Sequence, residues 1–363
     1  MSVFTDLSIE DINNISKKSG KNFIPDSLEH VLDGKTDSCF YLRDTKDKYF
    51  VKIHEDGRSS PHSTNYDLRY AIEFAHYLSC FNDQFNYLNI LRPVRWKNGE
   101  WYGHFKQSEG FEHNKLISIW PYIEPIHPVP SEISGNFDHS SIIKFGKAVG
   151  ELHNVSSKYL PSIKYPFPKD LMDILNTMRK IEALPKKKEN IQKYLYLNKN
   201  IKIINVECFF KDLNEMISIC INEWTKRRVD QNLKFGYIHG ELKPSNTIIH
   251  NNKLTFIDIS KCGIAPLSLE LGMSSQLFAN TECLNIIGIE RFIEAYLSTR
   301  SDFSKTELSF IPLMIKCSSI RLAVYRTYAV TAGFINQKSI ISPLEICKEV
   351  ERIEDDLLAK LTS

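Results

Sequence analysis

Alternating apolar and polar positions predict a strand over residues 48–54, and an apolar stripe at helical spacing follows it. The strand, Lys-Tyr-Phe-Val-Lys-Ile-His, carries Lys52 at its centre. Glu73 lies beside the stripe, on the side that can face the edge of a sheet. A lysine in mid-strand and a glutamate on a helix are ordinarily exposed to solvent, so the succession of these two elements is what makes them a candidate pair. The stripe consists of Tyr66, Tyr70, Phe74, Tyr77 and Leu78.

Further apolar segments extend the strand-rich first part of the chain. Segments 91–96 and 100–105 flank an Asn-Gly pair at 98–99, a two-residue turn signal that predicts a hairpin. The apolar run 117–124 predicts another strand, which ends at Pro121 because proline has no backbone N–H to donate.

Helical spacing dominates the second part of the chain. Four prolines between positions 121 and 130 separate the two parts, because proline interrupts regular structure. We therefore expect an α+β fold with a strand-rich lobe, 1–120, and a mostly helical lobe, 121–363. The segments that predict helices in the second lobe are 143–153, 170–228, 288–296 and 311–328.

A second predicted hairpin lies within the helical lobe. Two short apolar strands, 247–249 and 254–257, flank the turn His-Asn-Asn-Lys at 250–253. This hairpin is expected to place Asn246 and Asp258 side by side, since one residue precedes its first strand and the other follows its second.

The residue types around this hairpin suit phosphoryl transfer, which depends on positioning and charge neutralisation. Asn246 follows Glu241 by five positions, and Asp258 follows Asn246 by twelve. An amide oxygen and a carboxylate are suitable ligands for Mg²⁺. A further carboxylate is needed to hold and deprotonate an acceptor hydroxyl. Each residue alone is unremarkable, but three polar groups at set offsets around one hairpin favour a kinase active site.

The stretch 237–246, Tyr-Ile-His-Gly-Glu-Leu-Lys-Pro-Ser-Asn, resembles the His-Gly-Asp-Leu-His-x-x-Asn loop of the aminoglycoside phosphotransferase and choline kinase family. The resemblance implies a two-lobed protein-kinase-like fold with a small antiparallel sheet in the nucleotide-binding lobe. It implies that Glu241 is the catalytic base. Lys243-Pro244 looks more like the Lys-Pro of protein Ser/Thr kinases, which implies that Lys243 reaches the transferred phosphate. The family resemblance also implies ATP, or another nucleoside triphosphate, and Mg²⁺ as cofactors, with Asn246 and Asp258 as the metal ligands.

The resemblance assigns further residues in the first lobe to the nucleotide. Lys52 would hold the phosphates and pair with Glu73. The backbone of Tyr122 or Ile123 would bind adenine at the hinge between the lobes. Segment 32–41 lies where the family has its phosphate loop, and it offers Gly34 with the small polar residues Thr36 and Ser38. A plain hairpin turn explains that segment equally well.

The second lobe resembles the family in the order of its segments. Residues 288–296, Gly-Ile-Glu-Arg-Phe-Ile-Glu-Ala-Tyr, are similar to its Phe-Leu-x-Gly-Tyr helix. Residues 266–272 stand where the family has Gly-Pro followed by Asp-Leu-Ala, with Glu270 in place of that aspartate. A cationic acceptor would require acidic residues in its pocket, for which Glu270 and Glu294 are candidates.

Glu241 stands where the family has aspartate, and this departure leaves three functional hypotheses. The first is an active kinase that moves the γ-phosphate to a hydroxyl of a small molecule, such as an aminoglycoside or another antibiotic, an amino alcohol, homoserine or a sugar. The second is a pseudokinase that binds nucleotide as a regulator. The third is an atypical Ser/Thr protein kinase, which Lys243-Pro244 suggests. Asp258-Ile-Ser lacks the glycine of Asp-Phe-Gly, and no Ala-Pro-Glu segment follows, which argues against it.

Composition excludes several other classes. The 363 residues carry a formal net charge of +2, too small to predict a nucleic-acid partner. No apolar run approaches the roughly 20 residues that span a bilayer, and the N-terminus lacks the layout of a signal peptide. Eight cysteines without a Cys-x-x-Cys pair argue against zinc and favour a reducing, cytoplasmic setting. We expect no membrane partner; the oligomeric state is left open.

Overall fold

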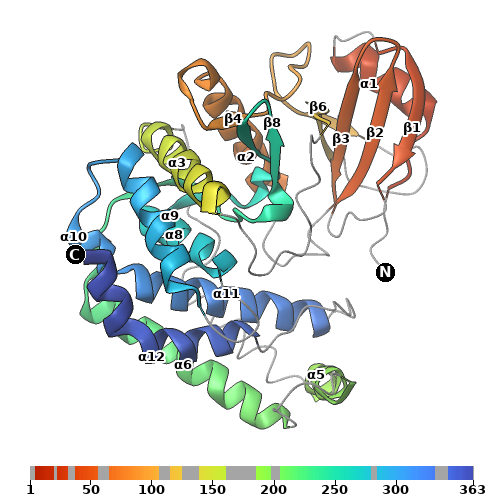
Figure 1. The fold of residues 1–363 in the computed structure, drawn as a ribbon. Coiled ribbons are helices and arrows are strands. Elements are labelled where there is room, and N and C mark those ends of the chain that lie inside the picture. Colours follow the sequence, from red (N-terminus) through yellow and green to blue (C-terminus); the bar gives the residue numbers. More distant parts are fainter. Residues whose placement is uncertain are drawn as a thin grey trace.

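The computed structural model of the chain combines a sheet near the N-terminus with a mostly helical C-terminal part (Figure 1). It describes residues 5–19, 23–31, 37–55, 65–105, 115–124, 139–160, 185–197, 205–278, 284–331 and 342–362. The elements of the first part are α1 (Ile9–Ser19), β1 (Pro25–His30), β2 (Ser38–Asp44), β3 (Lys48–His54), α2 (Asn65–Ser79), η1 (Asn82–Gln84), β4 (Leu88–Ile90), β5 (Gly103–Phe105) and β6 (Lys115–Pro121).

The second part begins with α3 and contains two further small sheets. Its elements are α3 (His139–Ser156), α5 (Pro185–Leu197), α6 (Val206–Lys226), α7 (Val229–Asn232), β7 (Phe235–Ile238), η2 (Pro244–Asn246), β8 (Thr247–His250), β9 (Lys253–Phe256), η3 (Ile259–Lys261), β10 (Gly263–Pro266), α8 (Leu267–Ser275), η4 (Gln276–Phe278), α9 (Ile286–Thr299), α10 (Lys305–Leu308), α11 (Ile311–Thr331) and α12 (Ser342–Thr362).

The N-terminal sheet has five strands in the order β1-β2-β3-β6-β5, with every neighbouring pair antiparallel. Side chains alternate between its two faces. Val51 and Ile53 of β3 are fully buried in a core that includes Ile12 and Ile15 of α1. Lys52 therefore projects from the opposite face, toward the hairpin predicted over residues 247–257, which we call the catalytic hairpin.

The predicted catalytic hairpin is confirmed as β8 and β9. Thr247 pairs with Phe256, and the turn residues Asn251 and Asn252 have positive φ values of 48° and 61°. Two successive residues in that region form the type of turn that matches the twist of paired strands. Strand β4 pairs in parallel with β9, so a segment of the first part completes the sheet of the hairpin.

The helices of the second part pack around a common core. Helix α3 lies against α9, and α11 lies against α8 and α12 (Figure 1). Gly272 of α8 allows the close approach to α11, because a Cβ atom there would lie 2.5 Å from the carbonyl carbon of Met314. Both helices also form hydrogen bonds to the loop that follows β7, at residues 239 and 240, so their packing helps to position that loop.

The α+β fold is confirmed, and one predicted strand is wrong. Residues 91–96 form no strand, although Trp96 and Gly99 close the predicted turn through backbone hydrogen bonds. Pro93 cannot donate to a ladder, and the Val94 N–H donates to Ile119 of β6 instead. Within the predicted helical stretch 170–228, the described residues are helical in α5, α6 and α7, and the remainder includes positions outside the described ranges.

Across the part of the chain that the structure describes, none of the helices is both long enough and apolar enough to cross a membrane.

Candidate functional site

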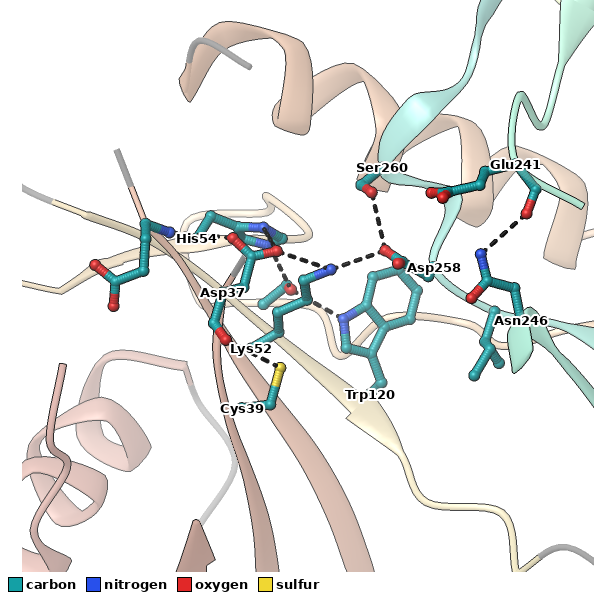
Figure 2. Close-up of polar contacts among 12 residues, drawn as sticks. Asp37, Cys39, Lys52, His54, Trp120, Glu241, Asn246, Asp258 and Ser260 are labelled. Atoms are coloured by element: carbon teal, nitrogen blue, oxygen red, sulfur yellow. Dashed lines mark hydrogen bonds and ion pairs between the residues drawn. The ribbon is translucent and has the colours of Figure 1, made fainter. Parts of the chain in front are cut away.

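Lys52 links the sheet to the catalytic hairpin. Its ammonium lies 2.8 Å from Asp258 Oδ1 and 2.9 Å from Asp37 Oδ2, so it sits between two carboxylates (Figure 2). Burial lowers the pKa of Lys52, but the charges of Asp258 and Asp37 outweigh it and raise that pKa well above its ordinary value. Lys52 is therefore a fixed cation at neutral pH.

Residues on the same face of the sheet surround Lys52. Its strand neighbours are Cys39 of β2 and Ser118 of β6, which register opposite it. Ser118 Oγ lies 3.0 Å from His54 Nε2 and accepts a hydrogen bond of 2.9 Å from the Trp120 indole. This bonding fixes the ring orientations on the face of the sheet from which Lys52 projects (Figure 2).

The expected ion pair between Lys52 and Glu73 is not formed. Among the described residues, Lys52 makes its ion pairs with Asp37 and Asp258. Glu73 lies on α2 in the electrostatic field of Glu100 and Arg69. Burial, and then the charge of Glu100, raises the pKa of Glu73. The apolar stripe of α2 predicted the helix correctly, but it did not determine the direction of this one polar side chain.

Asp258 and Asn246 lie together at the base of the hairpin, as predicted. The Ile257 N–H donates to the Asn246 carbonyl at 2.9 Å, across the register that begins with Thr247 and Phe256. Asp258 itself adopts a left-handed conformation, with φ 59° and ψ 54°. A non-glycine residue is uncommon there, and such strain is concentrated at functional sites.

The electrostatics of Asp258 suit a metal ligand. Burial raises the pKa of its carboxyl, but the charge and hydrogen bond of Lys52 and a hydrogen bond from Ser260 hold that pKa well below its usual range. Asn246 donates its amide Nδ2–H to the Glu241 carbonyl at 3.0 Å, which leaves Oδ1 as its ligating atom. Within the described ranges no group of three or more His, Cys, Asp or Glu side chains could hold a metal. The predicted pair is one amide and one carboxylate.

The catalytic loop follows β7 and turns at Gly240, whose φ is +82°. Glu241 is partly exposed, and its Oε1 lies 2.5 Å from the Lys243 ammonium. Both side chains are one-third exposed, so they border the open part of the site. The structure thus brings the expected base and the expected phosphate-binding lysine into direct contact.

Glu270 holds the backbone of this loop through hydrogen bonds and is not available to an acceptor. It is 0% exposed, and its two oxygens accept the His239 and Gly240 N–H groups, each at 2.8 Å. His153 Nε2 lies 3.2 Å from Oε2, and the other ring nitrogen of His153 contacts the Tyr296 hydroxyl. Burial alone would raise the pKa of Glu270. The hydrogen bonds and charges of His153 and His239 outweigh burial, so the pKa lies below its usual value. The predicted acceptor role is wrong, because this carboxylate is enclosed and fully bonded.

A family model described as the phosphotransferase enzyme family (APH) matches residues 28–302 of the chain. This match covers more than half of the sequence and includes both Lys52 and the catalytic hairpin. The chain belongs to this family. It is accordingly a small-molecule phosphotransferase.

Solved structures share the fold of this family member along nearly its whole length. Amicoumacin kinase in complex with AMP-PNP, Ca²⁺ and Ami has 14% identity and a TM-score of 0.61, with 95% of this chain and 92% of that chain covered. A microcompartment-associated aminopropanol kinase has 12% identity and a TM-score of 0.61, with 98% and 100% covered. Choline kinase from Cryptosporidium parvum has 12% identity and a TM-score of 0.56, with 97% and 95% covered.

These structural similarities establish a protein-kinase-like fold. Sequence identities of 12–14% support the shared fold alone. The comparison with curated proteins found no match.

The predicted phosphate loop of this phosphotransferase is only partly described. Gly34 and Thr36 lie outside the described residues. Ser38 is fully buried, and its hydroxyl donates to Glu55 Oε1 at 2.5 Å and accepts from the Thr5 N–H at 2.8 Å. Its side chain therefore joins the start of β2 to the residue after β3 and to the N-terminal segment, which argues against direct contact with a nucleotide.

In the segment predicted to form the hinge, the backbone N–H of Tyr122 already donates a hydrogen bond within the protein. The Tyr122 N–H donates to the Lys48 carbonyl at 3.0 Å and extends the pairing of β3 with β6. Ile123 comes next, and its N–H makes no hydrogen bond within the described ranges. The adenine contact predicted for the backbone of Tyr122 or Ile123 stays a prediction.

Sequence reasoning missed two residues of α11 that approach the catalytic loop. Arg321 is partly buried and donates to the Gly240 carbonyl at 3.0 Å. Tyr325 lies one turn further on, and burial, followed by the charges of Glu241, Asp258 and Asp37, raises the pKa of its hydroxyl. The spacing of four between Arg321 and Tyr325 was visible in the sequence, but nothing indicated which face of α11 meets the site.

Proposed function

We propose that this phosphotransferase moves the γ-phosphate of ATP to a hydroxyl of a small molecule in a magnesium-dependent reaction. The observation that carries the proposal is the contact between Lys52 and Asp258, which are 206 positions apart in the chain. This contact joins a cation on the sheet to a carboxylate of the hairpin, beside Asn246 and Glu241. A phosphate-binding cation, two metal ligands and a base are the parts that phosphoryl transfer requires.

Asn246 and Asp258 are the residues that would hold Mg²⁺. An amide oxygen and a carboxylate form a hard donor set, and the Nδ2–H bond of Asn246 to the Glu241 carbonyl leaves Oδ1 as the atom that would face the ion. Bound there, the ion would neutralise negative charge on the phosphates. Lys52 would bind the α- and β-phosphates through its ammonium, which the sheet holds in place. The relatives that were solved with AMP-PNP or ADP support a nucleotide in this site.

Glu241 is proposed as the base. Its carboxylate takes the proton of the acceptor hydroxyl, whose oxygen then forms a bond to the γ-phosphorus. The bond between that phosphorus and the β–γ bridging oxygen breaks, and ADP leaves with the electron pair. Lys243, already in contact with Glu241, supplies a second cation for the charge that develops on the transferred group.

The acceptor is proposed to enter on the side of α11, past Tyr325. Arg321, one turn before Tyr325 on the same helix, donates to the Gly240 carbonyl next to Glu241, and this contact of α11 with the catalytic loop supports the assignment. The candidate acceptors are antibiotics such as aminoglycosides, and metabolites such as amino alcohols, homoserine or sugars. Similar folds in an amicoumacin kinase, an aminopropanol kinase and a spectinomycin phosphotransferase support a small hydroxylated molecule.

A screen of ADP formation tests this function. The purified chain would be incubated with Mg-ATP and each candidate acceptor, with the Asp258→Asn variant as a matched inactive control. The expected result is acceptor-dependent ADP release by the wild type that the variant lacks. Tight binding of Mg-ATP with no turnover of any acceptor would instead favour a nucleotide-binding regulator.

A further inference from the structure

Asp37 has no role in the function proposed so far, yet it contacts the central cation of the site. It immediately precedes β2, and its Oδ2 lies 2.9 Å from the Lys52 ammonium. Its side chain is 11% exposed. A carboxylate so enclosed needs partners, and here the main partner is the lysine that would bind the phosphates.

A second set of contacts holds Asp37 in place. Its Oδ1 accepts a hydrogen bond of 3.2 Å from the Glu55 N–H, at the end of β3. His54 Nδ1 lies 3.8 Å from Oδ2, and the same ring is held by Ser118 through its other nitrogen. The backbone hydrogen bond fixes the carboxylate against β3, the strand that carries Lys52, and the His54 ring lies beside it beyond hydrogen-bond distance.

The two carboxylates on Lys52 differ in what else they can do. Asp258 lies on the catalytic hairpin and is a candidate metal ligand, so its carboxylate has a second partner when metal and nucleotide bind. Asp37 is tied to the sheet and keeps its place. Glu73, the residue expected to hold the lysine, lies near Glu100 and Arg69 instead.

We propose that Asp37 is the positioning residue of Lys52, and that it does the work expected of a glutamate on α2. The inference rests on the proposed nucleotide-binding function. Asp37 would remain paired with Lys52 while Asp258 holds the metal, and the other donors of the ammonium would be left for the phosphates. Because Asp37 lies at the start of β2 and Lys52 on the neighbouring strand β3, the lysine is oriented without any contribution from the position of α2.

Nucleotide binding by matched variants tests this assignment. Asp37→Asn keeps the shape and removes the charge, Asp37→Glu retains the charge, and Asp26→Asn changes an exposed aspartate of β1 in the same sheet. The dissociation constant for Mg-ATP and the KM values for ATP and acceptor would be measured, with thermal unfolding as a check on folding. Asp37→Asn is expected to weaken ATP binding roughly tenfold, since a charge-assisted hydrogen bond is lost. The acceptor KM should change little, and Asp37→Glu should recover part of the loss.

The outcomes separate this inference from the proposed function. If the wild type binds no nucleotide, the proposed function itself fails. If the wild type binds Mg-ATP and Asp37→Asn binds it equally well, Asp37 does not position the lysine. Tighter binding by Asp37→Asn would show that Asp37 competes with the phosphates for Lys52, which also overturns the inference. Should Asp37→Asn not fold, Glu73→Gln decides, because a loss of ATP affinity of tenfold or so in that variant would return the role to α2.

Discussion

Glu270 accepts the Gly240 N–H at 2.8 Å, and this bond ties the start of the catalytic loop to helix α8. Gly240 has a positive φ of 82°, so the loop reverses direction at the residue that Glu270 holds. Its carbonyl is held from the other side by Arg321 at 3.0 Å. The peptide groups next to the base are therefore fixed by a buried anion and a partly buried cation, while the base itself remains accessible.

Replacing Glu270 with glutamine is expected to destabilise the fold and the loop together. The variant keeps the shape of the side chain, but its NH₂ group meets a backbone N–H where an acceptor is needed. Each buried group left unsatisfied costs about 1–3 kcal/mol. We expect the free energy of unfolding in urea to fall by about that amount.

Glu294 of α9 provides the matched control for this experiment, because it is exposed on its helix. Glu294→Gln should change the free energy of unfolding by less than about 0.5 kcal/mol. An equally small change in Glu270→Gln would show that the carboxylate is not needed to hold the loop.

Shortening the base should lower the rate, although aspartate is the residue of the family motif. In the structure Glu241 reaches Lys243 at 2.5 Å, so the loop is arranged around the longer side chain. Glu241→Asp moves the carboxylate by about one bond length, and a displacement near 1 Å can cost roughly 100-fold in rate. The measurement is kcat for ATP consumption with a saturating acceptor. Glu215→Asp, on the exposed side of α6, is the control, and a large gain of kcat in Glu241→Asp would contradict the prediction.

The sequence predicted those parts of the site that depend on local patterns. Alternation over seven residues predicted β3 with Lys52 at its centre, and its bounds are those observed. The hairpin of β8 and β9 follows from two apolar runs and an Asn-Asn turn, and its register brings Asn246 and Asp258 together. These relationships are contained within short segments, where the period of side chains fixes the geometry.

The partners of side chains across distant segments were not predictable in the same way. Asp37 follows a segment with few pattern signals, and only the pairing of β2 with β3 brings it to Lys52. Glu73 lies on a correctly predicted helix, but the rotation of that helix against the sheet determines its neighbours. Glu270 was assigned to a pocket because acidic residues suit cationic ligands, whereas its position on the wholly buried helix α8 makes it a structural anion. Burial and helix rotation are set by tertiary packing, which one sequence pattern does not contain.

Stability is expected to fall with pH between 6.5 and about 4, in part because of His54. This side chain is 3% exposed, and burial lowers its pKa from 6.5 to about 4. The unfolded chain then binds a proton at higher pH than the folded chain does, so the contribution is complete above pH 6.5 and is lost as pH falls toward 4. A shift of this size corresponds to roughly 3 kcal/mol.

The variant His54→Gln should reduce this loss, because glutamine does not titrate. The free energy of unfolding in urea would be measured at pH 7.5 and pH 5 for the wild type, His54→Gln and His139→Gln. His139 is exposed at the start of α3, so its variant should keep the pH dependence of the wild type. The buried His153 and His239, whose pKa values burial also lowers, leave part of that dependence in every variant. A difference between the two pH values as large in His54→Gln as in the wild type would remove His54 from the explanation.

Removal of the amide ligand should uncouple nucleotide binding from magnesium. Asn246 offers Oδ1 to the ion while its Nδ2–H is held by the Glu241 carbonyl. In the wild type, Mg²⁺ should tighten the binding of ATP relative to a solution that contains EDTA. In Asn246→Ala the ratio of the two dissociation constants should fall roughly tenfold, because one of two protein ligands is lost. Asn13→Ala, on the exposed side of α1, is expected to keep the ratio of the wild type. If Asn246→Ala weakens ATP binding equally with Mg²⁺ and with EDTA, the residue shapes the loop and does not hold the metal.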